Sequence, residues 1–266
     1  MIAEPQYIQH FPAIDEAKAY ALVVHGLNNK PCLMLPIIES LNAKGIYVLN
    51  LCLAGHSDVV KNESDKRLLL KAFKNATRKV WQDQISIAIE VLKDLSQSRP
   101  RVLVGYSGGA VLSLELIQRL DIRFDKFLLF APAISFRNTH RLLRYLPFNT
   151  LLIPSLLDEA YRSNPGTPVS AYKAIFATSQ SCHKHEISTC LNIPALIVMD
   201  PKDEMLSFQS IKRFIDEKRL ENWRLLAVDG GAGQGNYHHL ITNKEFVKDN
   251  NWHIIWDEIE QFLNSR

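Results

Sequence analysis

A sharp turn from a strand into a helix at a serine is the feature that most constrains this chain. The apolar run 102–104 leads into Gly-Tyr-Ser-Gly-Gly at residues 105–109, and a segment of helical character continues to Leu120. Such a turn needs small residues on both sides of the serine, and Gly105 and Gly109 supply them. It pushes the Ser107 hydroxyl into the open, where a neighbouring base could activate it as a nucleophile. The same five letters could occur by chance in a loop, but the flanking strand and helix favour the nucleophile.

Short apolar runs alternate with segments of helical periodicity along most of the chain. This alternation predicts an α/β fold with a mostly parallel central sheet and helices on both faces. The expected strands are 21–24, 46–51, 102–104, 127–130, 195–199 and 223–228.

Residues 132–191 break the alternation. This segment contains Pro147, Pro154, Pro165 and Pro168, and no clear strand separates its helix-like pieces. These pieces are 139–146, 151–162 and 170–178. We therefore expect a helical cap insertion at 132–191, carried by a core of residues 1–131 and 192–266.

Composition limits the classes of protein to which the chain can belong. The 266 residues are 47% hydrophobic, which suits one large core. The net charge of +3 is spread without a basic block, so nucleic-acid binding is not indicated. Residues 1–7 lack the basic start and apolar stretch of a signal peptide, and no later run approaches about 18 apolar residues. We expect a cytoplasmic protein without classical export.

The cysteines and their neighbouring histidines are candidate zinc ligands. Cys32 and Cys52 lie far from the others, and the four cysteines are too sparse for a disulfide framework. Zinc could in principle be bound by the group Cys182, His183, His185 and Cys190. Their spacing matches no usual zinc finger or ribbon, so we expect no metal.

Carboxylates and histidines follow two later predicted strands, where an open parallel sheet gathers its reactive groups. Asp200, Asp203 and Glu204 follow the first of these strands, and His238 and His239 come after the second. A histidine could take the serine proton if an acid fixes its tautomer. The chain order Ser, Asp, His is therefore compatible with a catalytic triad, with either histidine as the base. Taken singly, each of these residues could equally be a solvated or packed side chain.

The hydrolysis of an acyl bond also needs donors for the developing oxyanion. The backbone N–H of Gly108 follows the nucleophile, and the loop after the first predicted strand can supply a second donor from Leu27. Gly26 keeps this loop close to the serine. His25 ends that strand, where we expect a structural hydrogen bond rather than catalysis.

Together these motifs resemble the α/β-hydrolase superfamily, in particular the branch that holds monoacylglycerol lipases, lysophospholipase-like enzymes and small bacterial carboxylesterases. The resemblance extends over nearly the whole chain. The matching pieces are 23–26 (Val-Val-His-Gly), 55–57 (Gly-His-Ser), 105–109, 193–198 with Asp203, and 237–240 (Tyr-His-His-Leu).

The resemblance implies roles for particular residues. In that branch the acid stands three residues after a glycine that ends its strand, and Asp200 occupies the glycine position, which selects Asp203. Lipase-like members carry Tyr-His-x-Leu, which selects His238. Small esterases carry His followed by two aliphatic residues and Thr, which would select His239. We favour His238 as the base and expect Gly26 and Tyr106 to contact the substrate.

In this superfamily the insertion is a lid over the serine. Residues 137–157 hold more apolar side chains than one buried stripe needs, so an acyl chain or a lipid surface could contact the excess. Simple packing of the lid on the sheet is the alternative.

These expectations combine into one hypothesis. The chain is a carboxylesterase, or a lipase-like enzyme for monoacylglycerol or lysophospholipid, that forms an acyl-enzyme at Ser107 without a cofactor. Its partner would be a small acyl ester or lipid-like substrate, with transient membrane contact through the lid. The alternatives are an amidase, peptidase or thioesterase on the same fold, or a binding protein without turnover.

Overall fold

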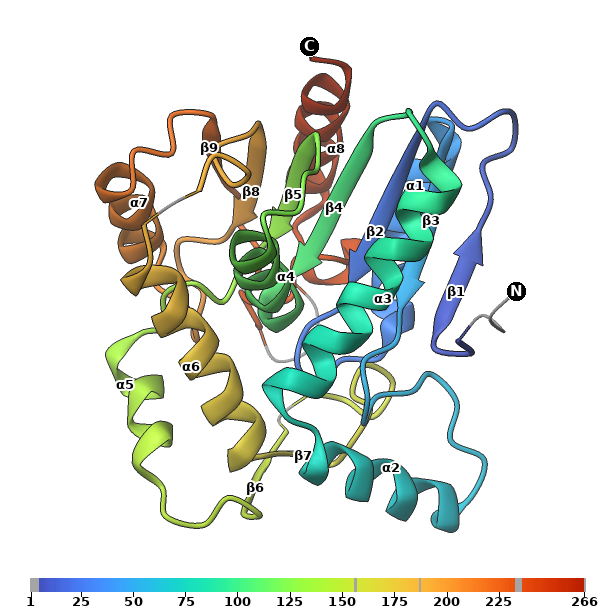
Figure 1. Cartoon of the computed structure of the whole chain (residues 1–266). Helices are drawn as coiled ribbons and strands as arrows, with labels where there is room; N and C mark the ends of the chain where they lie inside the picture. The colour runs from blue at the N-terminus through green and yellow to red at the C-terminus, as the bar shows by residue number, and fades with distance from the viewer. Residues whose placement is uncertain (1–4, 156, 187, 233–235, 266) are drawn as a thin grey trace.

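The computed structural model describes residues 5–155, 157–186, 188–232 and 236–265. Within these residues, seven strands form the central sheet in the order β1-β3-β2-β4-β5-β8-β9 (Figure 1). β1 is antiparallel to β3, and all other neighbours are parallel. The strands are β1 (Ile8–Phe11), β2 (Ala19–Val24), β3 (Ile46–Leu51), β4 (Arg101–Tyr106), β5 (Lys126–Phe130), β8 (Ala195–Met199) and β9 (Trp223–Ala227). The predicted α/β architecture is confirmed.

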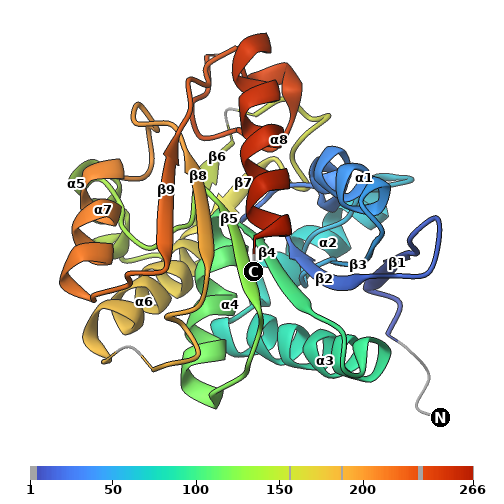
Figure 2. The same ribbon diagram turned by 90° about the horizontal axis from the view of Figure 1, so that it is seen from above.

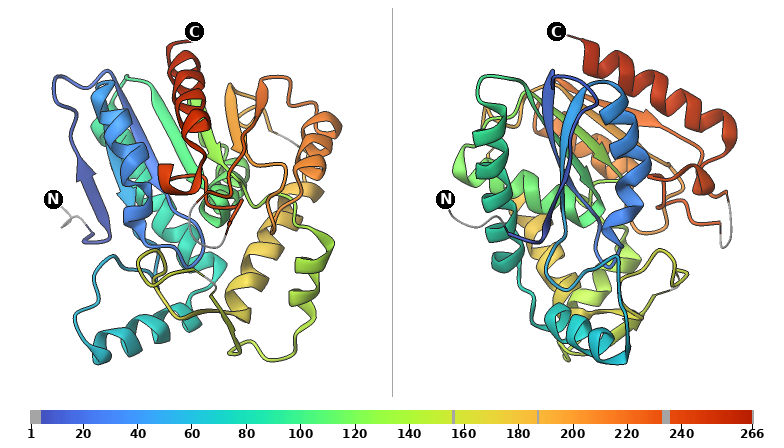
Figure 3. Two further views of the ribbon diagram at one scale, coloured as in Figure 1. Left: turned by 180° about the vertical axis from the view of Figure 1, so that it is seen from behind. Right: turned by 90° about the vertical axis from the view of Figure 1, so that its right-hand side faces the viewer.

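Helices cover both faces of the sheet. Figures 2 and 3 show α1 and α8 on one face and α3 and α4 on the other. Strands covered on both faces are apolar along their whole length, and Leu22, Leu103, Leu128 and Leu196 on four neighbouring strands are fully buried. The helices of this core are α1 (Leu35–Ala43), α2 (Glu63–Asn75), α3 (Arg78–Ser96), α4 (Ser107–Leu120), α7 (Phe208–Glu217) and α8 (Asp249–Asn264). Among the described residues, no helix has the length and apolar character needed to cross a membrane.

One core strand was not expected from the sequence. β1 lies at the edge of the sheet and pairs with β3 from Ile8 to Phe11. Only Ile8 of this strand is buried. A half-exposed edge strand of mixed composition gives no apolar run, which explains why its pattern was missed.

The insertion differs from the expected set of helices. It contains α5 (Asn138–Arg141), a 3-10 turn (Leu142–Tyr145), the two-stranded sheet of β6 (Leu152–Pro154) and β7 (Gly166–Pro168), and α6 (Val169–Lys184). The prediction of a helix at 151–162 is wrong, because its first part forms β6 and pairs with β7. Pro154 has no N–H for a helical hydrogen bond, and a short strand tolerates it. The predicted helix at 170–178 is confirmed and extends further at its C-terminal end.

Part of the insertion is packed firmly on the core. Ile175 and Phe176 of α6 belong to the main hydrophobic cluster, and α6 lies against α4 (Figure 1). The Ser181 hydroxyl donates a 3.0 Å hydrogen bond to Oε1 of the buried Glu115 on α4. We keep the cap at 132–191 as a proposal, with α6 as its anchored part.

Candidate active site

The turn from β4 to α4 places Ser107 at the carboxyl end of a central strand. Ser107 has a φ of +50°, a left-handed conformation that is unfavourable for a residue with a side chain. Its neighbours must be small, since a Cβ on Gly105 would lie 2.6 Å from Ala110 Cα, and one on Gly109 would overlap the backbone oxygen of His25. The two glycines thus permit the close backbone approach of this turn, which places Ser107 in the wall of a cavity at the carboxyl end of β4.

His239 and Asp203 extend from Ser107 as a chain of hydrogen bonds. His239 Nε2 lies 2.9 Å from Ser107 Oγ, and its Nδ1 lies 2.7 Å from Asp203 Oδ2. The other Asp203 oxygen accepts the backbone N–H groups of Met205 and Leu206, each at 2.8 Å. Asp203 is fully buried. A carboxylate on Nδ1 fixes the imidazole tautomer and leaves Nε2 free to accept the serine proton.

Burial and charge act in opposite directions on this pair. Burial lowers the pKa of His239, but the charge and hydrogen bond of Asp203, with the charge of Glu204, raise it above the usual value of 6.5. Burial raises the pKa of Asp203, but the charge and hydrogen bond of His239 and two backbone N–H groups lower it below 3.8. The net effect favours an ionised Asp203 beside an imidazole that readily takes a proton.

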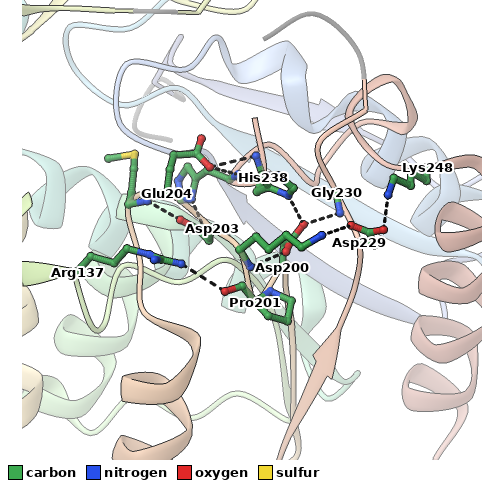
Figure 4. Close-up of polar contacts among 12 residues, drawn as sticks. Arg137, Asp200, Pro201, Asp203, Glu204, Asp229, Gly230, His238 and Lys248 are labelled. Carbon is green, nitrogen blue, oxygen red and sulfur yellow. Dashed lines mark hydrogen bonds and ion pairs between the residues drawn. The ribbon is translucent and has the colours of Figure 1, made fainter. Parts of the chain in front are cut away.

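The structure contradicts the choice of His238 as the partner of Ser107. His238 Nδ1 lies 2.7 Å from Asp200 Oδ2 and is turned to a different carboxylate (Figure 4). The backbone N–H groups of both histidines donate to Glu204 Oε2, at 3.1 and 3.2 Å. With the loop fixed there, the two consecutive side chains diverge, and only the ring of His239 reaches Ser107. The signal that selects His239 was present in the sequence as Leu-Ile-Thr at 240–242.

The predicted oxyanion donors lie next to each other. The backbone nitrogen of Leu27 is 3.5 Å from the position that a Cβ on Gly108 would take. The following residue, Asn28, has a φ of +59°, and its N–H donates to His56 Nε2 at 2.8 Å. The loop after β2 is therefore held beside the N-terminus of α4, where backbone N–H groups are unpaired.

Two buried histidines support this loop in the neutral form. His25 Nε2 accepts the Leu53 N–H at 3.1 Å, while His25 Nδ1 lies 2.8 Å from the Gly26 oxygen. Burial lowers the pKa of His25 to about 4 and the pKa of His56 well below 6.5. The geometry agrees with a structural hydrogen bond for His25.

The two residues expected to contact substrate are placed differently. Tyr106 lines the cavity above Ser107, and its hydroxyl donates to the His239 oxygen at 3.1 Å. Gly26 does not line this cavity. It packs behind Leu27, where a Cβ would lie 2.6 Å from Asn29 Oδ1 and 2.9 Å from the Tyr106 ring. The absence of a side chain at Gly26 leaves room for Asn29 and the Tyr106 ring, and a contact with substrate stays a prediction.

A cavity of about 410 Å³ opens above Ser107 and His239. Its walls come from both parts of the molecule: Leu27, Tyr106 and Glu204 belong to the core, and several residues come from the insertion. The insertion contributes Thr139, His140, Leu143, Ile153, Leu157 and Tyr172, among others. Leu143, Ile153 and Leu157 belong to the apolar segment for which the sequence predicts contact with an acyl chain. No local pattern links Thr139, His140 or Tyr172 to the serine, so the sequence did not assign them to the site.

One group of side chains has the geometry of a possible metal site. Among the described residues, Asp200, Asp229 and His238 bring one ligand atom each within 4.8 Å of one another. Their atoms already have partners, because Asp200 Oδ2 accepts the Gly230 N–H at 2.6 Å and Asp229 forms an ion pair with Lys248 (Figure 4). A lysine ammonium repels a cation, so this network fits an ion pair better than a metal. Two members of the cysteine and histidine group at 182–190 have hydrogen-bond partners outside that group of four. His183 Nε2 lies 3.0 Å from the Ile134 oxygen, and Cys190 Sγ lies 2.7 Å from the Ser188 hydroxyl.

A serine at a strand-to-helix turn of a mostly parallel, helix-covered sheet defines the α/β-hydrolase fold. The family model Hydrolase_4, described as serine aminopeptidase, S33, matches residues 15–162. The chain belongs to this family of hydrolases. No curated protein matches the sequence.

Solved structures with the same fold include several lipases and esterases. A soluble variant of monoglyceride lipase from Saccharomyces cerevisiae superposes with a TM-score of 0.75 at 13% identity, covering 97% of this chain and 90% of that chain. The monoacylglycerol lipase of Paleococcus ferrophilus gives 0.69 at 14% identity, with 97% and 98% covered. A carboxyl esterase from Bacillus coagulans gives 0.69 at 11% identity, with 97% and 93% covered. At these identities the likeness is one of fold.

Proposed function

We propose that the chain is a serine esterase that cleaves carboxylic esters through Ser107, His239 and Asp203. The observation that carries this proposal is the continuous hydrogen-bonded path from Ser107 Oγ through His239 to Asp203, with distances of 2.9 and 2.7 Å. This path supports the roles of nucleophile, base and acid for the three groups. His239 thus replaces His238 as the proposed base.

The first half-reaction transfers the acyl group to the enzyme. Ser107 Oγ attacks the ester carbonyl carbon while its proton passes to His239 Nε2. The carbonyl oxygen becomes an oxyanion, which the N–H groups of Gly108 and Leu27 would stabilise. As the oxyanion collapses, the bond to the alcohol oxygen breaks, and His239 gives its proton to that oxygen. Asp203 stabilises the imidazolium throughout.

The second half-reaction repeats these steps with water. His239 takes a proton from water, and the resulting hydroxide attacks the acyl carbon. The bond to Ser107 Oγ then breaks, the proton returns to Ser107, and a carboxylic acid is released. These steps use groups of the protein and require no cofactor.

The cavity supports an acyl ester of moderate size as the substrate. Leu143, Ile153, Leu157 and Tyr172 give one part of its lining an apolar character suited to an acyl chain. The lipases and esterase of similar fold, which include two enzymes named for monoglyceride or monoacylglycerol, point in the same direction.

A peptidase is the second candidate, because the matching family model is described as a serine aminopeptidase. The same Ser107, His239 and Asp203 could cleave an amide, so the two candidates differ only in substrate. We propose a panel of p-nitrophenyl esters of increasing chain length beside aminoacyl p-nitroanilides. Faster cleavage of the anilides would replace the esterase proposal with the peptidase.

Covalent labelling tests the nucleophile directly. We expect a fluorophosphonate probe to label the protein and to lose this labelling in Ser107→Ala. Ser113→Ala is a matched control, since Ser113 lies on the same helix α4 with its hydroxyl bonded to the Gly109 oxygen at 2.8 Å. Folded protein that takes no label, or that keeps its label in Ser107→Ala, would point to a binding protein or to a different nucleophile.

The exposed part of the insertion supports transient contact with a lipid surface. Leu142, Tyr145 and Phe148 are each about two thirds exposed, and exposed apolar groups of this kind favour such surfaces. We expect the double variant Tyr145→Ser, Phe148→Ser to bind phospholipid vesicles less than the parent protein. Ile14→Ser, which removes an exposed apolar side chain from the loop before β2, should bind as the parent does. Equal binding by all three proteins would exclude this contact.

A further inference from the structure

Glu204 directly follows the proposed acid Asp203 and contacts the backbone of both histidines. Its Oε2 accepts the N–H of His238 at 3.1 Å and that of His239 at 3.2 Å. We propose that Glu204 is a positioning residue, which holds His239 against Ser107 and makes the cavity unfavourable for anionic substrates. This inference rests on the proposed function and adds a residue to it.

His239 is held at several points besides its ring. Glu204 accepts its N–H, and the Tyr106 hydroxyl donates to its carbonyl oxygen at 3.1 Å. The Tyr106 ring also packs on the imidazole, with the centroids 5.3 Å apart. A proton transfer needs the base within hydrogen-bonding distance of its donor, so a loop that moves by an ångström would slow the reaction greatly. Glu204 fixes the segment of backbone on which the imidazole depends.

The charge of Glu204 also acts on the imidazole. The groups that face His239 are Asp203 on its Nδ1, Ser107 on its Nε2, Tyr106 across its ring, Glu204 at its backbone, and His140 from the insertion. Asp203 and Glu204 are both acidic, and both favour the protonated imidazole. Removing the charge at 204 while keeping the acceptor therefore separates the electrostatic effect from the structural one.

Glu204 also belongs to the wall of the cavity. Within the described residues, the cavity is lined by two histidines, His140 and His239, and by one acidic side chain, Glu204. No Asp, Lys or Arg of the described residues lines it. A carboxylate in the wall of the cavity repels a carboxylate on the substrate and leaves a neutral ester unaffected. The cavity should thus discriminate by charge as well as by shape.

The test uses Glu204→Gln, Glu204→Ala and the control Asp229→Asn. Gln keeps a carbonyl oxygen for both N–H groups and removes the charge, whereas Ala removes the acceptor too. Asp229 forms ion pairs with Lys248 (Figure 4) and with Lys202. Within the part of the chain that the structure describes, it is not among the hydrogen-bond partners of His239. Each protein is assayed on a neutral p-nitrophenyl ester and on one of equal length that ends in a carboxylate.

We expect Glu204→Gln to move the ascending limb of its kcat/KM profile to lower pH by about half to one unit, because a nearby negative charge shifts a pKa by this order. Its ratio of anionic to neutral ester turnover should rise about threefold to tenfold. Glu204→Ala should lower kcat about tenfold to a hundredfold with little change in KM, because the variant loses the alignment of the His239 ring with Ser107 and not substrate binding. Asp229→Asn should match the parent in all three measurements.

Folded Glu204→Gln with an unchanged pH profile and an unchanged charge preference would overturn the proposal. So would Asp229→Asn if it moved both quantities as far as Glu204→Gln does. These outcomes are distinct from failure of the proposed function, in which the parent protein itself would show neither ester turnover nor fluorophosphonate labelling.

Discussion

Two carboxylate–imidazole pairs lie side by side in this molecule, and only one of them reaches the serine. In both pairs the imidazole Nδ1 lies 2.7 Å from a carboxylate oxygen, as Asp203–His239 and as Asp200–His238. The first pair is buried, with 10% of the His239 side chain exposed, whereas 24% of the His238 side chain is exposed. A carboxylate partner therefore does not by its presence define a catalytic histidine. What matters is the group that faces the second ring nitrogen.

The second pair stabilises the loop that carries the first. Asp200 Oδ2 accepts both His238 Nδ1 and the Gly230 N–H, so it joins the two ends of the segment from Gly230 to His238. His239 begins where this bonded segment ends. The Asp200–His238 pair is therefore expected to contribute to stability, and the Asp203–His239 pair to turnover.

The largest expected difference between the pairs comes from removing each imidazole. We expect His239→Ala to lower kcat by about 10⁴-fold or more, since the general base is lost. His238→Ala should keep kcat within about tenfold, because a positioning group away from the substrate is lost. Steady-state kinetics on one p-nitrophenyl ester, with circular dichroism to check folding, measures both. A reversed order of the two variants would remove His239 from the mechanism.

Replacing each carboxylate gives the next largest contrast. Asp203→Asn should lower kcat by about 10⁴-fold, because an amide can stabilise the wrong imidazole tautomer and cannot stabilise the imidazolium. Asp200→Asn should cost about 1–3 kcal/mol of unfolding free energy, since a buried acceptor of three hydrogen bonds is altered. Kinetics and urea denaturation of both variants separate these effects. Comparable kcat losses in the two would contradict the division of roles.

The pH dependence of activity should report on His239 and not on His238. Only the neutral imidazole can accept the serine proton, so kcat/KM should rise with pH, about tenfold per unit well below the pKa of His239. Asp203 and Glu204 raise this pKa above 6.5 against the effect of burial, so the half-maximal point should lie above pH 6.5. His238→Ala should leave the midpoint in place. A midpoint that moves in that variant would assign the titration to His238.

A substitution at Gly231, beside the Asp200–His238 pair, should have a smaller effect than the changes above. Gly231 has a φ of +72°, and a Cβ there would lie 2.5 Å from His238 Cε1. Gly231→Ala should cost about 1–2 kcal/mol of stability through the left-handed backbone and displacement of the His238 ring. Its kcat should stay within about threefold of the parent, because the disturbance acts on His238 and Asp200 and costs only a small part of the stability. Thermal unfolding and ester kinetics together check this, and an inactive but stable variant would show that the two pairs are coupled.

Much of the fold and part of the site could be predicted from local patterns. Parallel strands that are covered on both faces are apolar throughout. The short apolar runs at 102–104 and 195–199 therefore predicted strands, and the structure has strands there. The turn at Ser107 was identified by the glycines that its close contacts require. The local pattern left Asp200, Asp203 and Glu204 as candidate acids, and the resemblance to the hydrolase branch selected Asp203. Each of these depends on residues that are near one another in the sequence.

The errors arose where distant residues decide the outcome. Residues 152–154 form a strand because β7 supplies the partner, and no local pattern announces that pairing. The position of the insertion over the serine was expected from the resemblance, but the contribution of Thr139, His140 and Tyr172 to the cavity depends on distant packing.

The amino-acid pattern alone predicts an α/β fold with a serine at the end of a central strand and an acid and a histidine after two later strands. The choice between the two adjacent histidines depends on the three-dimensional fold, which turns His239 toward that serine. Neighbouring residues in a loop share almost the same position along the chain and differ in the direction of their side chains. That direction follows from the backbone path, which Glu204, Asp200 and Tyr106 fix from other elements.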